Sequence, residues 1–205
     1  MKNNNIMLAI LFSILSILVV VSILTTIVHS QKENTTALQE IIDLETQVDI
    51  LEKKVKMFEK EKALIQKNIV LFDKIDLEAF TNHDMKTIKE IYSDNVRVYN
   101  PDGSMTAGIA LNERNLRQLF NTFPDIKITE HPIKFGFGNW TAGIGVTKGT
   151  WSNPMILTNG TVLQPTGKSF EMKIATLIKW NDGRIEEEHL FWDNEDWNKQ
   201  IGLGN

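Results

Sequence analysis

An uninterrupted apolar segment near the N-terminus constrains this chain more than any other feature of its sequence. Residues 6–28 read IMLAILFSILSILVVVSILTTIV and contain no charged side chain. About 20 such residues, at a rise of 1.5 Å each, are enough to cross a bilayer as one helix. The segment has no polar face, so a helix packed on a globular core is a poorer interpretation. We therefore predict a transmembrane anchor over residues 1–30.

Cleavage as a signal peptide is the alternative for the same segment. The apolar stretch of a signal peptide usually spans about 7–15 residues, which is shorter than this one. Ser30 nevertheless follows at a position where cleavage could occur. Lys2 and the α-amino group precede the segment, whereas Lys32 beyond it is balanced by Glu33. This distribution of charge favours a single-pass membrane protein with its N-terminus inside and its soluble domain extracytoplasmic.

A second pattern, with the period of a coiled coil, follows the apolar segment. Apolar residues recur at alternating steps of three and four, broken only at Lys62: Ile41, Leu44, Val48, Leu51, Val55, Phe58, Ile65, Ile69 and Phe72. No Gly or Pro occurs between residues 32 and 100, so nothing interrupts a helix. β-Branched residues at the first seam position and Leu at the second favour a parallel dimer. We predict a helical coiled-coil stalk over residues 31–71 that makes the protein a homodimer. A single amphipathic helix packed on its own domain is the alternative.

The remaining residues, 72–205, show helical patterns first and strand patterns afterwards. The expected helices cover residues 72–82, 84–92 and 110–121, and the expected strands cover residues 96–99, 126–128, 142–151, 170–180 and 184–193. The last two strands are joined by Asn181-Asp182-Gly183, a sequence typical of a tight hairpin. This order predicts an α+β domain in which three helices pack on one face of a bent antiparallel sheet.

Composition narrows the possible functions. The chain has 22 basic and 26 acidic residues, a formal net charge of −4 and no basic cluster, which argues against a nucleic-acid partner. It contains no Cys, so thiolate catalysis and Cys-based metal sites are excluded. No His, Asp or Glu cluster has the spacing of a metal site, and no glycine-rich loop matches a phosphate-binding pattern. We expect neither a metal nor a cofactor.

Four short motifs make this domain resemble the SnoaL-like polyketide cyclases. They are Phe123-Pro124-Asp125-Ile126 after the third helix, Pro165-Thr166-Gly167-Lys168 before the long strand, Asp182-Gly183-Arg184-Ile185 at the hairpin, and Asp193 followed by Gln200-Ile201-Gly202. The resemblance covers about residues 72–203 and implies the cone-shaped fold of nuclear transport factor 2 and ketosteroid isomerase. Enzymes, binding modules and scaffolds all use this fold, so the resemblance alone does not imply one function.

The resemblance also implies that Asp193 is the general acid/base of an intramolecular aldol closure. A carboxylate in an apolar pocket suits proton removal next to a carbonyl, because loss of hydration raises its proton affinity. The family carries a His two residues earlier, where this chain has Phe191, and His189 could substitute one step further along the strand. In the alternative, Asp193 caps the helix expected at residues 194–201, and Glu187 and His189 lie at a solvated edge of the sheet.

The last strand offers further candidate residues for a site. Alternation along it predicts that Ile185, Glu187, His189, Phe191 and Asp193 share one face. An acid, an imidazole and aromatic side chains in one row would suit the acid/base lining of a cavity. His131, in a strand expected to face the same sheet, is another catalytic candidate. The side chains expected to contact an apolar ligand are Tyr99, Trp151, Glu187 and Phe191.

Two functional hypotheses follow. In the first, a membrane-tethered domain binds a small apolar ligand or a partner protein in or on its cone, without catalysis. In the second, the domain is a small-molecule lyase, isomerase or cyclase that uses Asp193 as general acid/base. The anchor and the stalk favour the first, because cyclisation of soluble intermediates needs no membrane. A closed apolar pocket that reaches Asp193 would favour the second hypothesis, whereas a cone filled by Trp and Phe side chains would favour the first.

Overall fold

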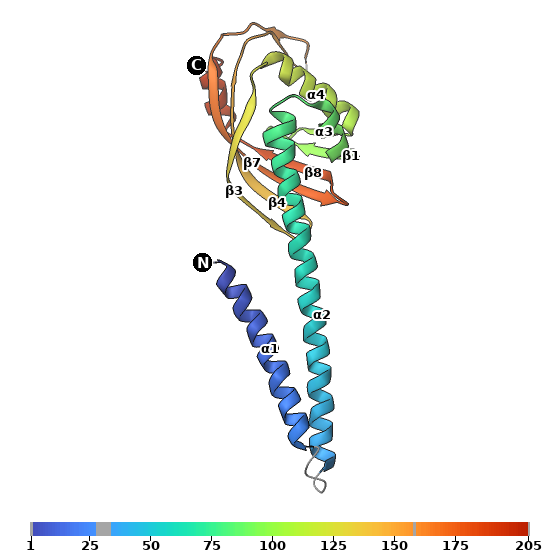
Figure 1. Cartoon of the computed structure of the whole chain (residues 1–205). Helices are drawn as coiled ribbons and strands as arrows, with labels where there is room; N and C mark the ends of the chain where they lie inside the picture. The colour runs from blue at the N-terminus through green and yellow to red at the C-terminus, as the bar shows by residue number, and fades with distance from the viewer. Residues whose placement is uncertain (1, 28–33, 158, 205) are drawn as a thin grey trace. The chain divides into compact units, whose positions relative to one another are not determined.

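The computed structural model describes residues 2–27, 34–157 and 159–204 (Figure 1). The chain divides into two compact units, Met1–Phe58 and Glu59–Asn205, which are described separately. Helix α1 (Lys2–Ile27) lies in the first unit. Among the residues that the structure describes, no helix combines the length and the apolarity needed to cross a membrane. The anchor expected over residues 1–30, of which residues 1 and 28–30 fall outside the described ranges, stays a prediction.

One long helix, α2 (Asn34–Asp73), runs through the heptad pattern and continues as a π-helical segment, η1 (Lys74–Phe80). This confirms the uninterrupted helix expected from the absence of Gly and Pro. In the first unit the seam residues Leu51, Val55 and Phe58 are more than half exposed. In the second unit the helix packs on its own sheet, where Phe72 is fully buried. The C-terminal end of the helix therefore packs on its own domain, as the alternative to the coiled coil predicted. For the exposed part of the seam, the coiled coil stays a prediction.

A six-stranded sheet with the order β2-β1-β8-β7-β4-β3 forms the second unit. Its strands are β1 (Tyr92–Tyr99), β2 (Met105–Ala107), β3 (Lys127–Phe137), β4 (Trp140–Thr150), β7 (Ser169–Asn181) and β8 (Arg184–Phe191). Neighbours pair antiparallel except β1 and β8, which are parallel. The expectation of a wholly antiparallel sheet was wrong because β1 and β8 are distant in sequence, so no hairpin dictates their direction. A separate small hairpin joins β5 (Met155–Ile156) and β6 (Val162–Leu163).

Three further helices complete this unit: α3 (Met85–Ile91), α4 (Ile109–Thr122) and α5 (Asn194–Ile201). Asp84 caps α3, since its side chain accepts hydrogen bonds from the backbone N–H groups of Lys86 and Thr87. The largest fully buried apolar side chains are Trp151, Phe72, Phe123, Ile75, Ile88, Ile178, Ile185 and Ile201. They come from both the helices and the sheet, so one core joins the two layers, and the expected α+β architecture is confirmed.

A β-bulge in β8 sets which of its side chains face inward. Lys179 of β7 pairs with Glu187, but the next residue, Trp180, pairs with Ile185, so Glu186 is an extra residue on β8. Ile185 and Glu188 are therefore both turned to the buried face, although they are three positions apart. Strict alternation would have placed them on opposite faces.

A second bulge, in β3, turns His131 inward. Glu130 pairs with Val146 and Ile133 with Ile144, so His131 and Pro132 together stand opposite Gly145. A Cβ atom at Gly145 would lie 3.6 Å from the His131 ring, which shows that the ring lies over this glycine. Pro132 lacks a backbone N–H and is tolerated because a bulge does not require that hydrogen bond.

Candidate functional site

A cavity of about 300 Å³ lies inside the second unit, lined by residues of η1, α3, α4, α5 and the sheet. Most of its wall is apolar: Ile75, Phe80, Ile88, Val98, Leu116, Leu119, Phe123, Ile126, Ile128, Phe170, Met172, Ile174 and Leu190. The cone is thus not filled by its aromatic side chains. A largely apolar cavity with a few polar groups is typical of sites for small molecules.

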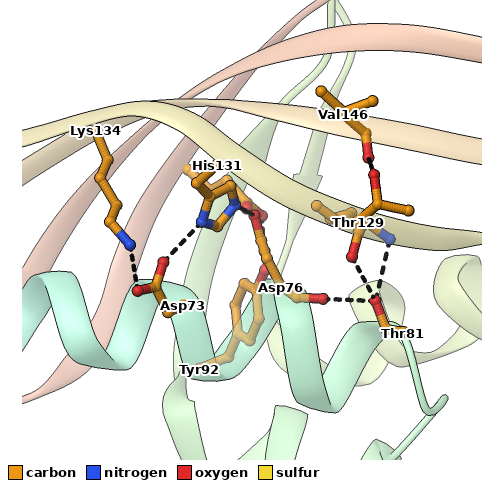
Figure 2. Close-up of polar contacts among 10 residues, drawn as sticks. Asp73, Asp76, Thr81, Tyr92, Thr129, His131, Lys134 and Val146 are labelled. Carbon is orange, nitrogen blue, oxygen red and sulfur yellow. Dashed lines mark hydrogen bonds and ion pairs between the residues drawn. The ribbon is translucent and has the colours of Figure 1, made fainter.

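Asp76, on η1, is a buried carboxyl group in the cavity wall. Nε2 of His131 lies 3.0 Å from its Oδ2 atom, and Nδ1 of the same ring lies 2.9 Å from Oδ1 of Asp73. Lys134 donates to the other carboxylate oxygen of Asp73. Figure 2 shows this array running from Lys134 through Asp73 and His131 to Asp76. The side chain of His131 is 1% exposed and that of Asp73 is 32% exposed, so the array leads from the surface to the cavity.

The electrostatics of the array follow from burial and pairing. Burial raises the pKa of Asp76, and although the hydrogen bond and charge of His131 lower it, the pKa stays above its ordinary value. Burial lowers the pKa of His131, but the hydrogen bonds and charges of Asp76 and Asp73 outweigh this and raise it overall. Burial raises the pKa of Asp73 as well, yet its hydrogen bonds with Lys134 and His131 bring it below the ordinary value. Asp73 is therefore the member held as a carboxylate.

Glu188 faces the same cavity from β8. The hydroxyl of Tyr92, on the neighbouring parallel strand, donates a hydrogen bond of 2.8 Å to Glu188 Oε2, and both side chains are buried. Burial and the charge of Asp76 raise the pKa of Glu188 to about 8, against the opposite effect of the Tyr92 hydrogen bond. Burial and the charges of Glu188 and Asp76 raise the pKa of Tyr92 well above its ordinary value. At neutral pH the cavity therefore holds a protonated carboxyl group at Glu188.

Other polar atoms in the cavity wall are buried without a hydrogen-bond partner among the described residues. They are Asn112 Nδ2, Thr147 Oγ1, Trp192 Nε1 and Trp197 Nε1. Three of the four are N–H donors, and a buried donor left unpaired costs free energy. A ligand that offers acceptor oxygens would satisfy them. No three His, Asp or Glu side chains in the described part of the chain, the cavity included, are grouped so that they could hold a metal ion.

The structure places two of the residues singled out from the sequence outside the lining of this cavity. Asp193 is exposed and caps α5, accepting hydrogen bonds of 2.9 and 3.0 Å from the backbone N–H groups of Glu195 and Asp196. This geometry corresponds to helix capping, the alternative to a catalytic role for Asp193. Trp151 is fully buried in the core, and its Nε1 donates to the carbonyl oxygen of Asn153. Neither residue is among those that line the cavity.

Four more of these residues gather on the outer face of the sheet. Tyr99 stacks on His189 with ring centroids 4.4 Å apart. Glu187 forms ion pairs with Arg97 and Lys179, and Phe191 is 52% exposed. The bulge at Glu186 is the reason: alternation counted from the inward-facing Ile185 puts Glu187 and His189 inside, whereas the extra residue turns them outward.

His131 is the one sequence candidate that takes part in the cavity site, through its contact with Asp76. Asp76, Tyr92 and Glu188 were not predicted from the sequence to belong to the site. Asp76 did carry a signal, because it stands between Ile75 and Ala79 on the apolar side of a helix, where a charged residue is costly unless it is paired. Tyr92 and Glu188 carried none, since their contact joins strands that are 96 residues apart.

Comparison with known proteins places this site in a family context. The model of the SnoaL-like polyketide cyclases matches residues 72–201. A protein of Jannaschia sp. CCS1 assigned to these cyclases is 16% identical, with a TM-score of 0.60 over 69% of this chain and 96% of that chain. IdmH of Streptomyces antibioticus, assigned as a polyketide cyclase, is 24% identical, with a TM-score of 0.55 over 66% and 98%. An LEH-like epoxide hydrolase of M. tuberculosis is 15% identical, with a TM-score of 0.52 over 68% and 92%.

These similarities differ in what they show. No curated protein matches the sequence. The solved structures share the fold at low identity, and they include a protein with the ketosteroid isomerase-like fold, so the cone expected from the motifs is confirmed. The family match spans nearly the whole of the residues 72–203 that the motifs pointed to, and well over half of the chain. The chain therefore belongs to the SnoaL-like polyketide cyclase family.

Proposed function

We propose that the domain is an acid–base enzyme that removes a proton next to the carbonyl group of a small, largely apolar compound. One observation carries the proposal: two buried carboxyl groups, Asp76 and Glu188, face one apolar cavity in different electrostatic surroundings. Asp76 is paired with His131, whereas Glu188 is bonded to the neutral hydroxyl of Tyr92. When two carboxyl groups have surroundings that give them different pKa values, one can act as the acid and the other as the base.

In the proposed reaction Asp76 is the general base and Glu188 the general acid. Asp76 takes the proton from the carbon next to the carbonyl, while Glu188, protonated because its pKa is about 8, gives its proton to the carbonyl oxygen. The product of this step is a neutral enol. Return of the proton from Asp76 to a different carbon, while the enol O–H gives its proton back to Glu188, would complete an isomerisation. Attack of the enol carbon on a second carbonyl of the same ligand would close a ring, with the enol proton returning to Glu188 and the proton of Asp76 going to the new alkoxide. The apolar wall keeps water from competing for these protons.

Deuterium exchange tests the base without knowledge of the natural substrate. The full chain in D₂O is mixed with small cyclic ketones and 1,3-diketones, and loss of the α-proton signal is followed by NMR. Asp76→Asn should lower the accelerated exchange by a factor of about 10²–10⁴, the usual contribution of a general base. Asp193→Asn is the matched control: it also replaces one carboxylate by an amide, but at an exposed helix cap. Equal loss in both variants would contradict the assignment.

A second pair of variants tests the acid. Glu188→Gln keeps the shape of the side chain and removes the acidic proton, so exchange should slow in the same assay. Glu187→Gln changes the adjacent residue on the outer face, where it pairs with Arg97 and Lys179, and should leave exchange unchanged. If the outer-face variant slowed exchange as much as Glu188→Gln, the cavity would not be the reacting site.

Binding without catalysis is the second candidate function, and the unpaired donors Asn112 Nδ2, Trp192 Nε1 and Trp197 Nε1 support it independently. A binding domain would hold neutral ketones in its cavity, where those donors reach acceptor oxygens. Wild type and Asp76→Asn would then bind the same ketone equally, and neither would accelerate exchange. Turnover by the wild type distinguishes the enzyme from the binding domain.

The membrane anchor and the homodimer are proposals that rest on the sequence. The uncharged residues 6–28 support a single-pass anchor with the domain extracytoplasmic, and the heptads support a parallel dimer. The exposure of Leu51, Val55 and Phe58 adds support to the dimer, because a second copy of the helix would cover this apolar seam.

A further inference from the structure

Asp73 lies outside the cavity and yet is connected to the proposed base through one side chain. It is not among the residues that line the cavity, and its carboxylate accepts from Lys134 on one oxygen and contacts His131 Nδ1 on the other. The opposite nitrogen of the same ring meets Asp76. Asp73 and Asp76 are three positions apart where α2 passes into η1, so both carboxyl groups can reach one imidazole.

The ring of His131 is held in one orientation from several sides. Phe72 packs against it with ring centroids 4.6 Å apart, and the missing side chain of Gly145 leaves room on the sheet. The β3 bulge at His131 and Pro132 turns the ring toward the helix. With both nitrogens facing carboxyl groups, an imidazolium can donate a hydrogen bond at both ends, whereas a neutral ring can donate at one end only.

We propose that Asp73 is a positioning residue which, by holding His131 as an imidazolium, makes Asp76 and not Glu188 the ionised carboxyl group of the cavity. The inference rests on the proposed function for its catalytic meaning, but its physical content is a charge assignment that exists without any ligand.

The charged and titratable groups around the cavity show why a cation next to Asp76 is needed to decide which carboxyl group is ionised. Asp76 contacts His131 of β3, and its charge acts on Glu188 of β8 and on Tyr92 of β1, while the charge of Asp73 acts on Asp76. Two carboxyl groups that face one apolar space cannot both ionise cheaply, so one of them keeps a proton. A cation next to one member decides which. His131 is that cation in the array, and it contacts Asp76 directly.

Asp73 can stabilise the imidazolium because its own carboxylate is partly exposed to solvent and paired with a lysine. Its side chain is partly exposed and is paired with Lys134, so it stays a carboxylate at neutral pH, as the lowering of its pKa by Lys134 and His131 also indicates. The permanent negative charge of Asp73, next to Nδ1 of His131, then favours the protonated imidazole ring. The base inside the cavity is thus set by a residue that needs no contact with the ligand.

Carboxyl NMR titration of the full chain tests the assignment without ligand. The chain is labelled with ¹³C at the Asp and Glu carboxyl groups, and the signals of Asp76 and Glu188 are assigned with Asp76→Asn and Glu188→Gln. In the wild type Asp76 should titrate at a lower pH than Glu188. His131→Gln removes the cation and should raise the titration midpoint of Asp76 by about one pH unit or more. Asp73→Asn should raise it by a smaller amount, and Asp73→Glu should restore it.

Asp125→Asn is the control for a purely structural effect. Asp125 is also an exposed carboxylate, and it accepts hydrogen bonds from the backbone N–H and hydroxyl of Thr150. This variant should lower the melting temperature and leave the midpoint of Asp76 in place. If His131→Gln does not fold, the Asp73→Asn and Asp73→Glu pair carries the test by itself.

Two results would overturn the proposal: an Asp76 midpoint above that of Glu188 in the wild type, or an Asp76 midpoint that is the same in wild type and Asp73→Asn. These outcomes are separate from failure of the proposed function. If the wild type shows the expected titration order but accelerates no deuterium exchange, the charge assignment is supported and the proposed enzymatic function is contradicted. Exchange that persists at the wild-type pH profile in Asp73→Asn would retain the enzyme and remove the role of Asp73.

Discussion

The hydroxyl of Tyr92 donates a 2.8 Å hydrogen bond to Glu188 Oε2, and this contact joins two parallel strands whose residues are 96 positions apart in the chain. The hydrogen bond favours the carboxylate, while burial and the charge of Asp76 favour the protonated acid. The second effect is larger, so the pKa of Glu188 is raised to about 8. The folded protein therefore keeps a proton that the unfolded chain releases near the ordinary value of 4.5.

The stability of the domain should consequently fall as the pH rises from about 4.5 to about 8. In this window the folded state binds more protons than the unfolded state, and Glu188 alone contributes up to roughly 5 kcal/mol of the difference. The raised pKa values of Asp76 and His131 act in the same direction. Glu188→Gln should therefore flatten the curve without abolishing its slope. Urea unfolding followed by Trp fluorescence is the measurement, because all five Trp lie between residues 140 and 197. A wild-type stability that rises across this window would contradict the charge state assigned to Glu188.

The cap of α5 gives a prediction with opposite results for two substitutions at one position. Asp193→Ala removes the acceptor for the N–H groups of Glu195 and Asp196 and should cost about 1 kcal/mol of stability. Asp193→Asn should be nearly silent, since Asn caps helices about as well as Asp. Melting temperatures of the two variants check this. An alanine variant as stable as the wild type would mean that the cap contributes nothing.

The seam of α2, which is more than half exposed at Leu51, Val55 and Phe58, should mediate dimerisation. Leu44→Asp combined with Leu51→Asp would bury unpaired charge at the interface and should convert a dimer into a monomer. Lys53→Asp is the control, because Lys53 lies off the seam and only forms an exposed pair with Asp49. Sedimentation of the full chain in detergent measures the state. A wild-type chain that sediments as a monomer at high concentration would rule out the coiled coil.

The anchor proposed for residues 6–28 makes a simple biochemical prediction. The full chain should stay in the membrane fraction after a carbonate wash, because about 20 uncharged residues partition into lipid as a helix. Lys2 and the N-terminus should remain inside, and protease added from outside should reach the domain. Recovery of a soluble chain that begins near residue 31 would identify the segment as a cleaved signal.

Local features of the fold could be predicted from the sequence because local residues determine them. Asn181-Asp182-Gly183 predicted a tight hairpin, and Asp182 and Gly183 do adopt positive φ angles of 48° and 78° between β7 and β8. The start of α3 was equally visible, since Asp84 is a strong cap. Both features depend on a few adjacent residues, for which tertiary packing adds little information.

The site could not be predicted in the same way because it depends on relations between distant segments. The parallel pairing of β1 with β8 brings Tyr92 to Glu188, and no sequence pattern encodes that pairing. The contact between His131 and Asp76 similarly joins a strand to a helix 55 positions earlier. Regular alternation from Ile185 predicted that Glu187 faces inward and Glu188 outward. Because Glu186 is an extra residue in β8, the two side chains lie on the opposite faces from those predicted.

The two bulges have a consequence for how this chain could change in length during evolution. Each one stores a single spare residue, Glu186 in β8 and Pro132 in β3. Loss of the codon for either residue would remove that bulge and leave Glu188 or His131 pointing inward. The same loss in the middle of β7, which pairs with β4 without interruption, would exchange the two faces of everything that follows. The strands that carry Glu188 and His131 thus tolerate a deletion at a defined point, whereas β7 does not.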